Sequence, residues 1–232
     1  MGKALAENFA ESRAVFDTAS SVLGLDLGRL CFEGSESELA DTRNTQPAVM
    51  AAGLAAWAAA RARGLVFHGA VGHSLGEVTA WVACGVVDMR TGFEIVKVRS
   101  QAMVEAVAGR PGAMAAVMGL PASKVAEVLA AFPPHEVLGA NWNSDDQVVM
   151  AGTPEGVEKA GAELKKAGAK RVIPLKVGGA FHTPGLKPAS DRLRAFLKGL
   201  QAQGRLRRAG SPVFANVDGK ASTEPEELLQ AL

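Results

Sequence analysis

Apolar residues recur at helical spacing along much of the chain. In residues 3–23, one face carries Leu5, Phe9, Phe16 and Leu23, and Gly24 follows the last of them. This spacing predicts an amphipathic helix that ends before the glycine. Residues 33–38 are rich in Gly, Ser and Glu and predict a loop.

The same pattern predicts a set of helices and short apolar strands that alternate. Helices are predicted over residues 48–60, 74–84, 89–107 and 184–200, and strands over residues 70–72 and 213–217. Asn44 or Thr45 is expected to cap the first of these helices. Strands that alternate with helices favour a parallel sheet covered by helices on both faces.

Residues 110–177 show a different rhythm. Strands are predicted over 113–119, 137–141, 147–152 and 171–177, with helices from Ser123 to about residue 131 and from Pro154 onward. Ser123 and Thr153 are the expected caps of these two helices. The order βαββαβ is typical of a ferredoxin-like unit. We therefore predict a large α/β domain, residues 1–109 and 178–232, with a small ferredoxin-like subdomain, residues 110–177, inserted in it.

Composition excludes several classes of protein. The chain has 232 residues, 48% of them hydrophobic, and a formal net charge of +1. This balance argues against a nucleic-acid-binding protein and against a disordered chain. Two cysteines cannot form a disulfide framework, which favours a reducing compartment. The longest apolar run, residues 48–60, is too short to span a bilayer, and no signal-peptide pattern is present, so we expect no membrane association and a cytoplasmic location.

Residues 72–76 read GHSLG, a G-x-S-x-G pattern between a predicted strand and a predicted helix. In an α/β-hydrolase-like sheet this pattern forms a sharp turn that exposes the serine, here Ser74, as a nucleophile. The backbone N–H of Leu75 would then face a developing oxyanion. A glycine-rich turn in which Ser74 only caps the helix is the structural alternative.

A nucleophilic serine requires a base, and His182 is the best placed of the four histidines. It lies after a glycine-rich strand end and just before a helix, where an α/β sheet exposes its loops. A purely structural histidine is an equal alternative. Arg99 lies mid-helix beside apolar residues, where it either extends along the surface, pairs with a carboxylate, or binds a substrate carboxylate. No metal-binding or nucleotide-binding pattern is present, and we expect no metal and no cofactor.

Together these segments resemble malonyl-CoA:acyl carrier protein transacylases and the acyltransferase domains of polyketide synthases. The resemblance rests on residues 72–77 (GHSLGE), 44–48 (NTQPA), 141–152 (NWNSDDQVVMAG), 180–182 (AFH) and 216–219 (NVDG), and on the place of Arg99. These segments occur in the family's order across nearly the whole chain.

The resemblance implies transfer of a malonyl group from malonyl-CoA to the phosphopantetheine thiol of acyl carrier protein, in fatty acid or polyketide synthesis. It implies that Ser74 is the nucleophile, that His182 activates it, and that malonyl-CoA is a substrate and not a cofactor. It also implies that Arg99 binds the malonyl carboxylate, with Gln46 and Phe181 as further substrate-binding residues. Leu75 and Phe181 are the pair that goes with malonyl selection in the related polyketide domains.

The family pattern extends beyond this sequence at both ends. Relatives have an F-P-G-Q-G-S-Q loop, with a second oxyanion donor, before the segment that matches residues 1–3. They also have a segment past the region of Leu232, which orients the histidine. The resemblance therefore implies that both terminal segments are missing and that this chain is a poor catalyst. Hydrolysis of an acyl thioester by the same Ser–His pair, or binding without catalysis, remain alternatives.

Overall fold

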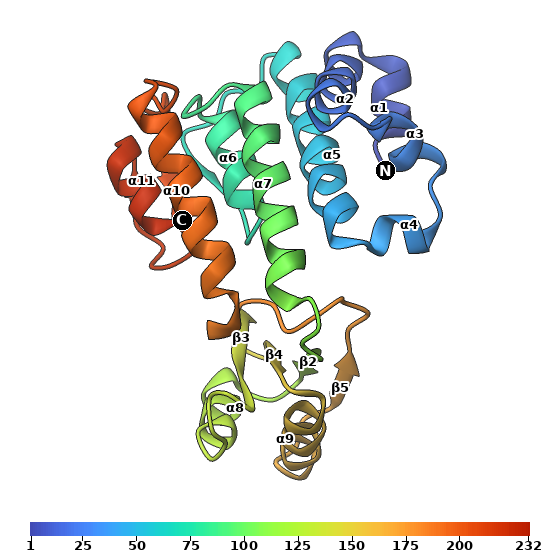
Figure 1. Cartoon of the computed structure of the whole chain (residues 1–232), viewed down its shortest axis with the longest axis vertical. Helices are drawn as coiled ribbons and strands as arrows, with labels where there is room; N and C mark the ends of the chain where they lie inside the picture. The colour runs from blue at the N-terminus through green and yellow to red at the C-terminus, as the bar shows by residue number, and fades with distance from the viewer. The chain divides into compact units, whose positions relative to one another are not determined.

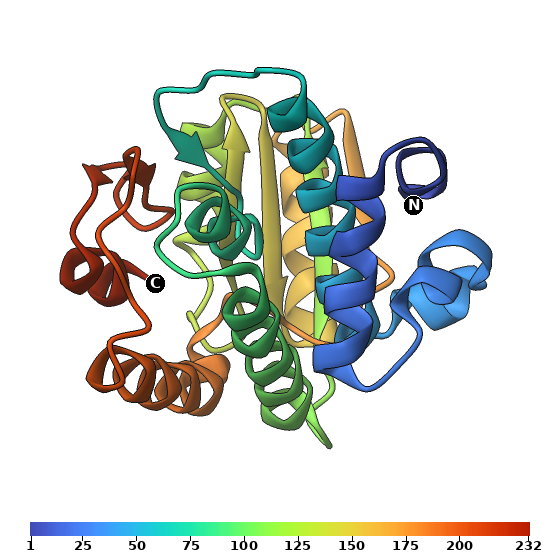
Figure 2. The same cartoon turned by 90° about the horizontal axis from the view of Figure 1, so that it is seen from above.

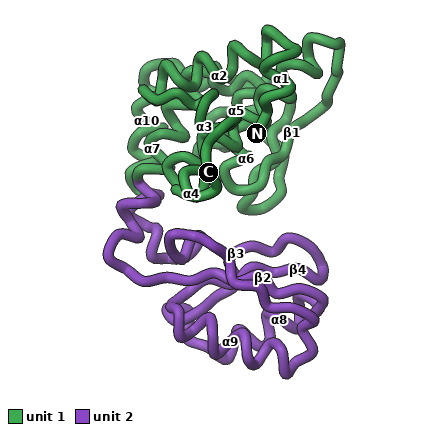
Figure 3. The backbone as a smooth tube through the Cα atoms, turned by 90° about the vertical axis from the view of Figure 1, so that its right-hand side faces the viewer, with its two compact units in different colours: residues 1–101, 191–232 green, residues 102–190 purple.

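The computed structural model describes residues 1–232, with the helices and strands labelled in Figure 1. The chain divides into two compact units, which Figure 3 colours separately. Unit 1 comprises residues 1–101 and 191–232, and unit 2 comprises residues 102–190. The boundaries fall within α7 (Met89–Val107) and α10 (Lys187–Ala202). The domain limits predicted from the sequence, after residues 109 and 177, stay a prediction.

The amino-terminal region of unit 1 contains more helices than predicted. Two helices, α1 (Lys3–Asn8) and α2 (Ala10–Leu23), replace the single helix expected over residues 3–23, because Phe9 between them has extended backbone angles. The predicted loop at residues 33–38 is wrong, since α3 (Leu27–Glu33) and α4 (Glu36–Ala40) fill most of it. Ser35 and Glu38 form a capping box that starts α4, a local signal that outweighs the Gly and Ser content.

Helix α5 (Thr42–Ala62) begins six residues earlier than predicted and contains Pro47. Its cap is Asp41, whose carboxylate accepts a hydrogen bond from the Arg43 N–H, so the prediction of Asn44 or Thr45 as the cap is wrong. Those two side chains instead donate to backbone carbonyls of the preceding segment. Helices α2 and α5 lie side by side (Figures 1 and 2).

The sheet of unit 1 is small, and it positions the site. Strand β1 (Ala70–Val71) pairs in parallel with β6 (Val213–Phe214), and β6 pairs antiparallel with β7 (Ala221–Ser222). Strand β6 ends earlier than predicted because the residues after it form a turn, in which the Ala215 N–H donates to the Lys220 carbonyl. Helix α6 (Gly76–Ala83) follows β1, and α11 (Pro225–Ala231) follows β7.

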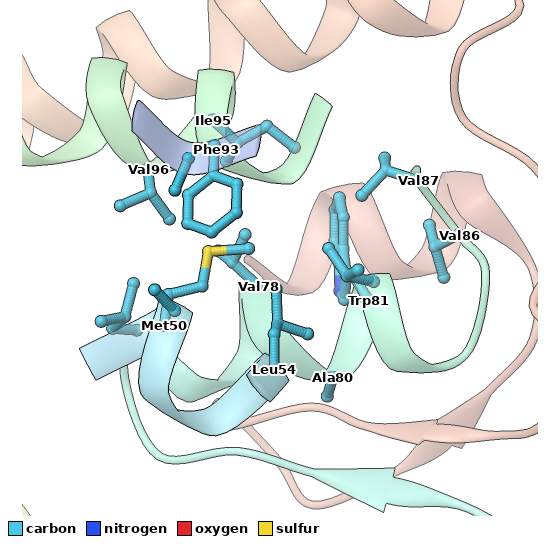
Figure 4. Packing of buried hydrophobic residues seen from close by; sticks show 14 of the residues in the cluster. Met50, Leu54, Val78, Ala80, Trp81, Val86, Val87, Phe93, Ile95 and Val96 are labelled. Carbon is cyan, nitrogen blue, oxygen red and sulfur yellow. The ribbon is translucent and has the colours of Figure 1, made fainter. Parts of the chain in front are cut away.

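The core of unit 1 lies between three helices that carry or support the site. Met50 of α5, Val78 and Trp81 of α6, and Phe93 and Val96 of α7 are fully buried against one another (Figure 4). Burying a large apolar side chain to this extent contributes about 1.5–3 kcal/mol to the free energy of unfolding. The core therefore fixes α6 relative to α7, and α7 carries Arg99.

Unit 2 has the predicted βαββαβ order. Strands β2 (Ala113–Met118), β3 (Val137–Ser144), β4 (Gln147–Gly152) and β5 (Arg171–Pro174) form an antiparallel sheet in the order β3-β4-β2-β5, with helices α8 (Ala122–Leu129) and α9 (Pro154–Lys166). This is the ferredoxin-like arrangement, so the α/β fold class with its inserted ferredoxin-like unit is confirmed.

Of the two helix caps predicted in unit 2, one is confirmed and the other is wrong. Thr153 caps α9, and its hydroxyl accepts a hydrogen bond from the Gly156 N–H. Ser123 does not cap α8, because that helix begins one residue earlier, after Pro121. Pro121 occupies the cap position instead, so Ser123 lies inside the first turn.

Both faces of the unit 2 sheet are buried along its two central strands, β2 and β4. On β2, Ala115 and Val117 pack on the α8 and α9 side, while Met114 and Ala116 pack on the other face with Met103 and other residues. This alternation follows the two-residue period of a strand. A 3-10 turn, η1 (Pro184–Leu186), precedes α10. None of the helices is both long and apolar enough to cross a lipid bilayer.

Candidate active site

The GHSLG segment forms the predicted strand-to-helix turn. Strand β1 ends at Val71 and α6 begins at Gly76, and Ser74 between them has a φ of 53°. A left-handed backbone is unfavourable for a residue with a side chain and is typical of strained functional turns. Only glycine fits at position 72, because a Cβ there would lie 1.9 Å from the Gly76 carbonyl oxygen. The turn thus has the geometry of a nucleophile elbow.

Arg99 reaches the elbow from α7. Its Nη2 donates to Ser74 Oγ at 3.0 Å, and its Nη1 donates to Gln46 Oε1 at 2.5 Å. Gln46 is buried on α5, so the guanidinium bridges two helices and the candidate nucleophile. Burial lowers the pKa of Arg99 to about 10, against which the Glu77 carboxylate acts to raise it. Arg99 therefore remains cationic at neutral pH.

Asn216 and Glu77 also belong to the elbow, although no sequence pattern assigned them an individual role. Asn216 Oδ1 accepts from the Ser74 backbone N–H at 2.9 Å, and its Nδ2 donates to Glu77 Oε2 at 2.9 Å and to the Gly72 carbonyl. Glu77 is 2% exposed and lies in the first turn of α6. A glutamate in the apolar start of a helix was the available signal for it, since buried carboxylates need partners.

His182 and Phe181 lie in unit 2, on the segment between β5 and η1. His182 has a φ of 58° and is exposed, while Phe181 is buried against the sheet. Thr183 Oγ1 donates to the Ala180 carbonyl at 3.0 Å and closes the turn around the histidine. The structure thus brings together Ser74, Leu75, Gln46 and Arg99 within unit 1. The pairing of Ser74 with His182 stays a prediction.

The other three histidines, His68, His73 and His135, are all exposed. No group of three or more His, Cys, Asp or Glu side chains is arranged to hold a metal ion. Leu75, the predicted oxyanion donor, is buried at the amino end of α6, where helix N–H groups favour negative charge. The elbow therefore offers an anion-stabilising helix end beside a candidate nucleophile and a buried cation.

Known families and proteins resemble this chain over nearly its whole length. The acyl transferase domain model matches residues 1–224. A malonyl CoA-acyl carrier protein transacylase of Bacillus subtilis is 36% identical over 234 residues, covering 100% of this chain and 73% of the relative. The corresponding protein of Salmonella typhimurium is 37% identical over 230 residues, covering 98% of this chain and 73% of the relative.

Solved structures agree with these relatives in fold. A malonyl-transacylase in complex with its type II polyketide synthase acyl-carrier protein superposes with a TM-score of 0.93 at 38% identity, covering 100% of this chain and 74% of that one. An acyl carrier protein S-malonyltransferase from Vibrio cholerae gives a TM-score of 0.88 at 39% identity, with 98% and 74% covered. The chain therefore belongs to the acyl transferase domain family.

Proposed function

We propose that this chain transfers a malonyl group from malonyl-CoA to the phosphopantetheine thiol of acyl carrier protein, in fatty acid or polyketide synthesis. One observation supports this above the others: a buried arginine donates directly to the hydroxyl of the elbow serine. A cation at that place suits an acyl group that carries its own carboxylate, as malonyl does, because a guanidinium fork matches a carboxylate in shape and charge.

In the proposed reaction, Ser74 Oγ attacks the thioester carbonyl while His182 takes the hydroxyl proton. The tetrahedral oxyanion is stabilised by the Leu75 N–H, and the C–S bond then breaks as His182 returns the proton to the leaving thiolate of coenzyme A. The carrier-protein thiol next gives its proton to His182 and attacks the malonyl ester, and the C–Oγ bond then breaks as His182 returns the proton to Ser74 Oγ. Arg99, with Gln46 and Phe181, binds the malonyl group throughout. No metal or cofactor takes part in this scheme.

The proposed location is the cytoplasm. Cys31 and Cys84 are both buried and free, and burial raises the pKa of both thiols. Unpaired cysteines of this kind suit a reducing compartment, which also holds the coenzyme A thioester substrate. The proposed partners are thus malonyl-CoA and acyl carrier protein.

The role of Arg99 is tested by substrate choice. Arg99→Ala is expected to lower kcat/KM for malonyl-CoA by about 100-fold or more and to improve the relative use of acetyl-CoA, because the acetyl group brings no charge to pair. Ser74→Ala is the control for covalent loading and should take up no acyl group, as seen by mass spectrometry of the intact chain. An unchanged malonyl-to-acetyl ratio in Arg99→Ala would remove the argument for malonyl.

The acceptor is tested separately. Malonyl-loaded chain is mixed with holo acyl carrier protein or with buffer alone, and the loss of the acyl group from Ser74 is followed. Transfer predicts rapid loss only with the carrier protein, and malonyl-carrier protein as the product. Equal loss in both mixtures would show that water is the acceptor and that the chain is a hydrolase.

A further inference from the structure

We infer that Asn216 and Glu77 form a clasp that holds Ser74 in its left-handed conformation, and that both are positioning residues for the nucleophile. This inference rests on the proposed function only in taking Ser74 as the reacting group. We call these two residues the elbow clasp.

The sheet explains why Asn216 reaches the elbow. Strands β1 and β6 are parallel, and Val71 pairs with Phe214. Gly72 and Ala215 therefore follow the two strands at the same end of the sheet, and this places Asn216 next to the turn that contains Ser74. The turn after β6 is itself fixed, because the Gly219 N–H donates to the Ala215 carbonyl at 2.9 Å and Asp218 accepts from the Lys220 N–H at 3.0 Å.

The orientation of the Asn216 amide is set by its partners. Its oxygen meets an N–H donor, that of Ser74, while its nitrogen meets two acceptors, the Gly72 carbonyl and Glu77 Oε2. The reversed amide would face like groups at all three contacts. The Asn216 side chain is thus hydrogen-bonded to Ser74, to the backbone of Gly72 and to Glu77 in the first turn of α6.

Glu77 completes the clasp and connects it to Arg99. One of its carboxylate oxygens accepts from both the side-chain and the backbone nitrogen of Asn216, at 2.9 and 3.2 Å. Its other oxygen is buried and has no hydrogen-bond partner. Because a buried carboxylate needs a balancing charge, the attraction to Arg99 is the remaining support for it. The same carboxylate therefore holds Asn216 and balances the cation beside Ser74.

The direction of its hydrogen bonds distinguishes a positioning role for Asn216 from a role in which its side chain only fills space. Asn216→Asp keeps the volume and an acceptor for the Ser74 N–H, but it places a second carboxylate oxygen against Glu77 Oε2 and the Gly72 carbonyl. Asn216→Ala removes the bonds without adding repulsion. If polarity matters, the near-isosteric Asp variant is worse than the Ala variant, whereas a space-filling role predicts the opposite order.

The double variant Asn216→Asp with Glu77→Gln tests the pair. A glutamine at 77 can donate to the new aspartate, which restores one bond with its polarity reversed. We expect a serine-reactive probe to label Ser74 at least about tenfold faster in this double variant than in Asn216→Asp alone. A change of this size is roughly the contribution of one charge-assisted hydrogen bond. Asp218→Ala is the matched control, since it loosens the same turn without touching the clasp.

Two measurements on the full chain follow the clasp directly. The first is hydrogen exchange at the Ser74 amide, which is expected to speed up at least about tenfold in Asn216→Ala and to change little in Asp218→Ala. The second is the rate at which a fluorophosphonate probe labels Ser74, expected to fall about tenfold in Asn216→Ala and further in Asn216→Asp. Thermal unfolding of each variant, checked in parallel, separates misplacement of Ser74 from loss of the fold.

Neither measurement uses malonyl-CoA or a carrier protein. A wild-type chain that reacts with the probe but not with malonyl-CoA would therefore refute the proposed substrate and leave the clasp standing. The clasp itself is refuted if Ser74 amide exchange is unchanged in Asn216→Ala, or if Asn216→Asp labels faster than Asn216→Ala and the double variant restores nothing.

Discussion

Ser74 and His182 are the two non-glycine residues of the chain with a left-handed backbone, yet their surroundings differ. The Ser74 turn is held by polar bonds from distant segments: Asn216 binds its N–H, and Arg99 binds its hydroxyl. The His182 segment is held by packing, since Phe181 is buried against the unit 2 sheet and Gly179 lies against Val107.

This difference separates two ways of fixing a strained residue. Directional hydrogen bonds fix the angle of the serine hydroxyl, and they tolerate little change in polarity. Apolar packing fixes the position of a segment and tolerates substitutions that conserve volume. A serine that acts as a nucleophile, as we propose for Ser74, must approach a carbonyl from a narrow range of directions, and hydrogen bonds provide this control.

The largest effect is expected from Gly72→Ala. The new Cβ would lie 1.9 and 2.0 Å from the Gly76 carbonyl oxygen and carbon, and these are backbone atoms that cannot move aside. We expect the Ser74 turn to open and acylation by malonyl-CoA to fall at least about 100-fold. Single-turnover acylation followed by mass spectrometry measures this loss.

Gly76→Ala is the matched control in the same turn. A Cβ at Gly76 meets no atom within 4 Å, and the residue is helical. Alanine there should leave acylation within about threefold and stabilise the chain slightly, because it reduces the freedom of the unfolded state. Equal losses in the two variants would show that the turn is sensitive to any change and not to the close approach at Gly72.

An intermediate effect is expected from Gly112→Ala, in the packed region of unit 2. Its Cβ would lie 2.4 Å from the Ala180 backbone nitrogen, two residues before His182. The histidine segment must then shift, and we expect acylation to fall about tenfold while the Ser74 amide exchanges as in the wild type. Gly178→Ala, which meets no atom within 4 Å, is its control.

A result in which Gly112→Ala acylates normally would mean that the position of the 180–183 segment does not limit the reaction. The proposed general-base role of His182 would then need other support. Exchange at the Ser74 amide shows whether any loss arises in unit 2 or at the elbow.

The smallest effect is expected from Phe181→Leu. Phe181 is 9% exposed and packs with Met114, Ala151 and neighbouring apolar residues. Leucine keeps the site apolar at a modest loss of volume, so we expect a loss of about 1 kcal/mol in the free energy of unfolding, measured by urea denaturation. A loss above about 3 kcal/mol would show that the ring holds the segment by more than its volume.

Much of this site was accessible from the sequence because its signals are local. The GHSLG pattern and the helix that contains Arg99 lie close together in the sequence, within residues 72–107. The capping box at Ser35 was equally local, but the glycine and serine content around it predicted a loop instead. Helix α5 began early because Asp41, rather than the NTQP segment, provides its cap.

The clasp could not be predicted in this way. Asn216 and Ser74 are 142 residues apart, and only the parallel pairing of β1 with β6 brings them together. Nothing in the residues around Asn216 indicates which strand β6 joins or in what register. The role of Glu77 was hidden for a related reason, since its partner is this same distant asparagine.

The discontinuous sequence of unit 1 has a consequence for biosynthesis. Translation reaches Ser74 long before it reaches Asn216, because the whole of unit 2 is made in between. At about 5–20 residues per second, the serine waits roughly 7–30 s for its partner. During that interval unit 2 can fold from contiguous sequence, while the Ser74 turn cannot form its bonds to Asn216. The Ser74 turn is therefore completed last, after most of the rest of the chain has been made.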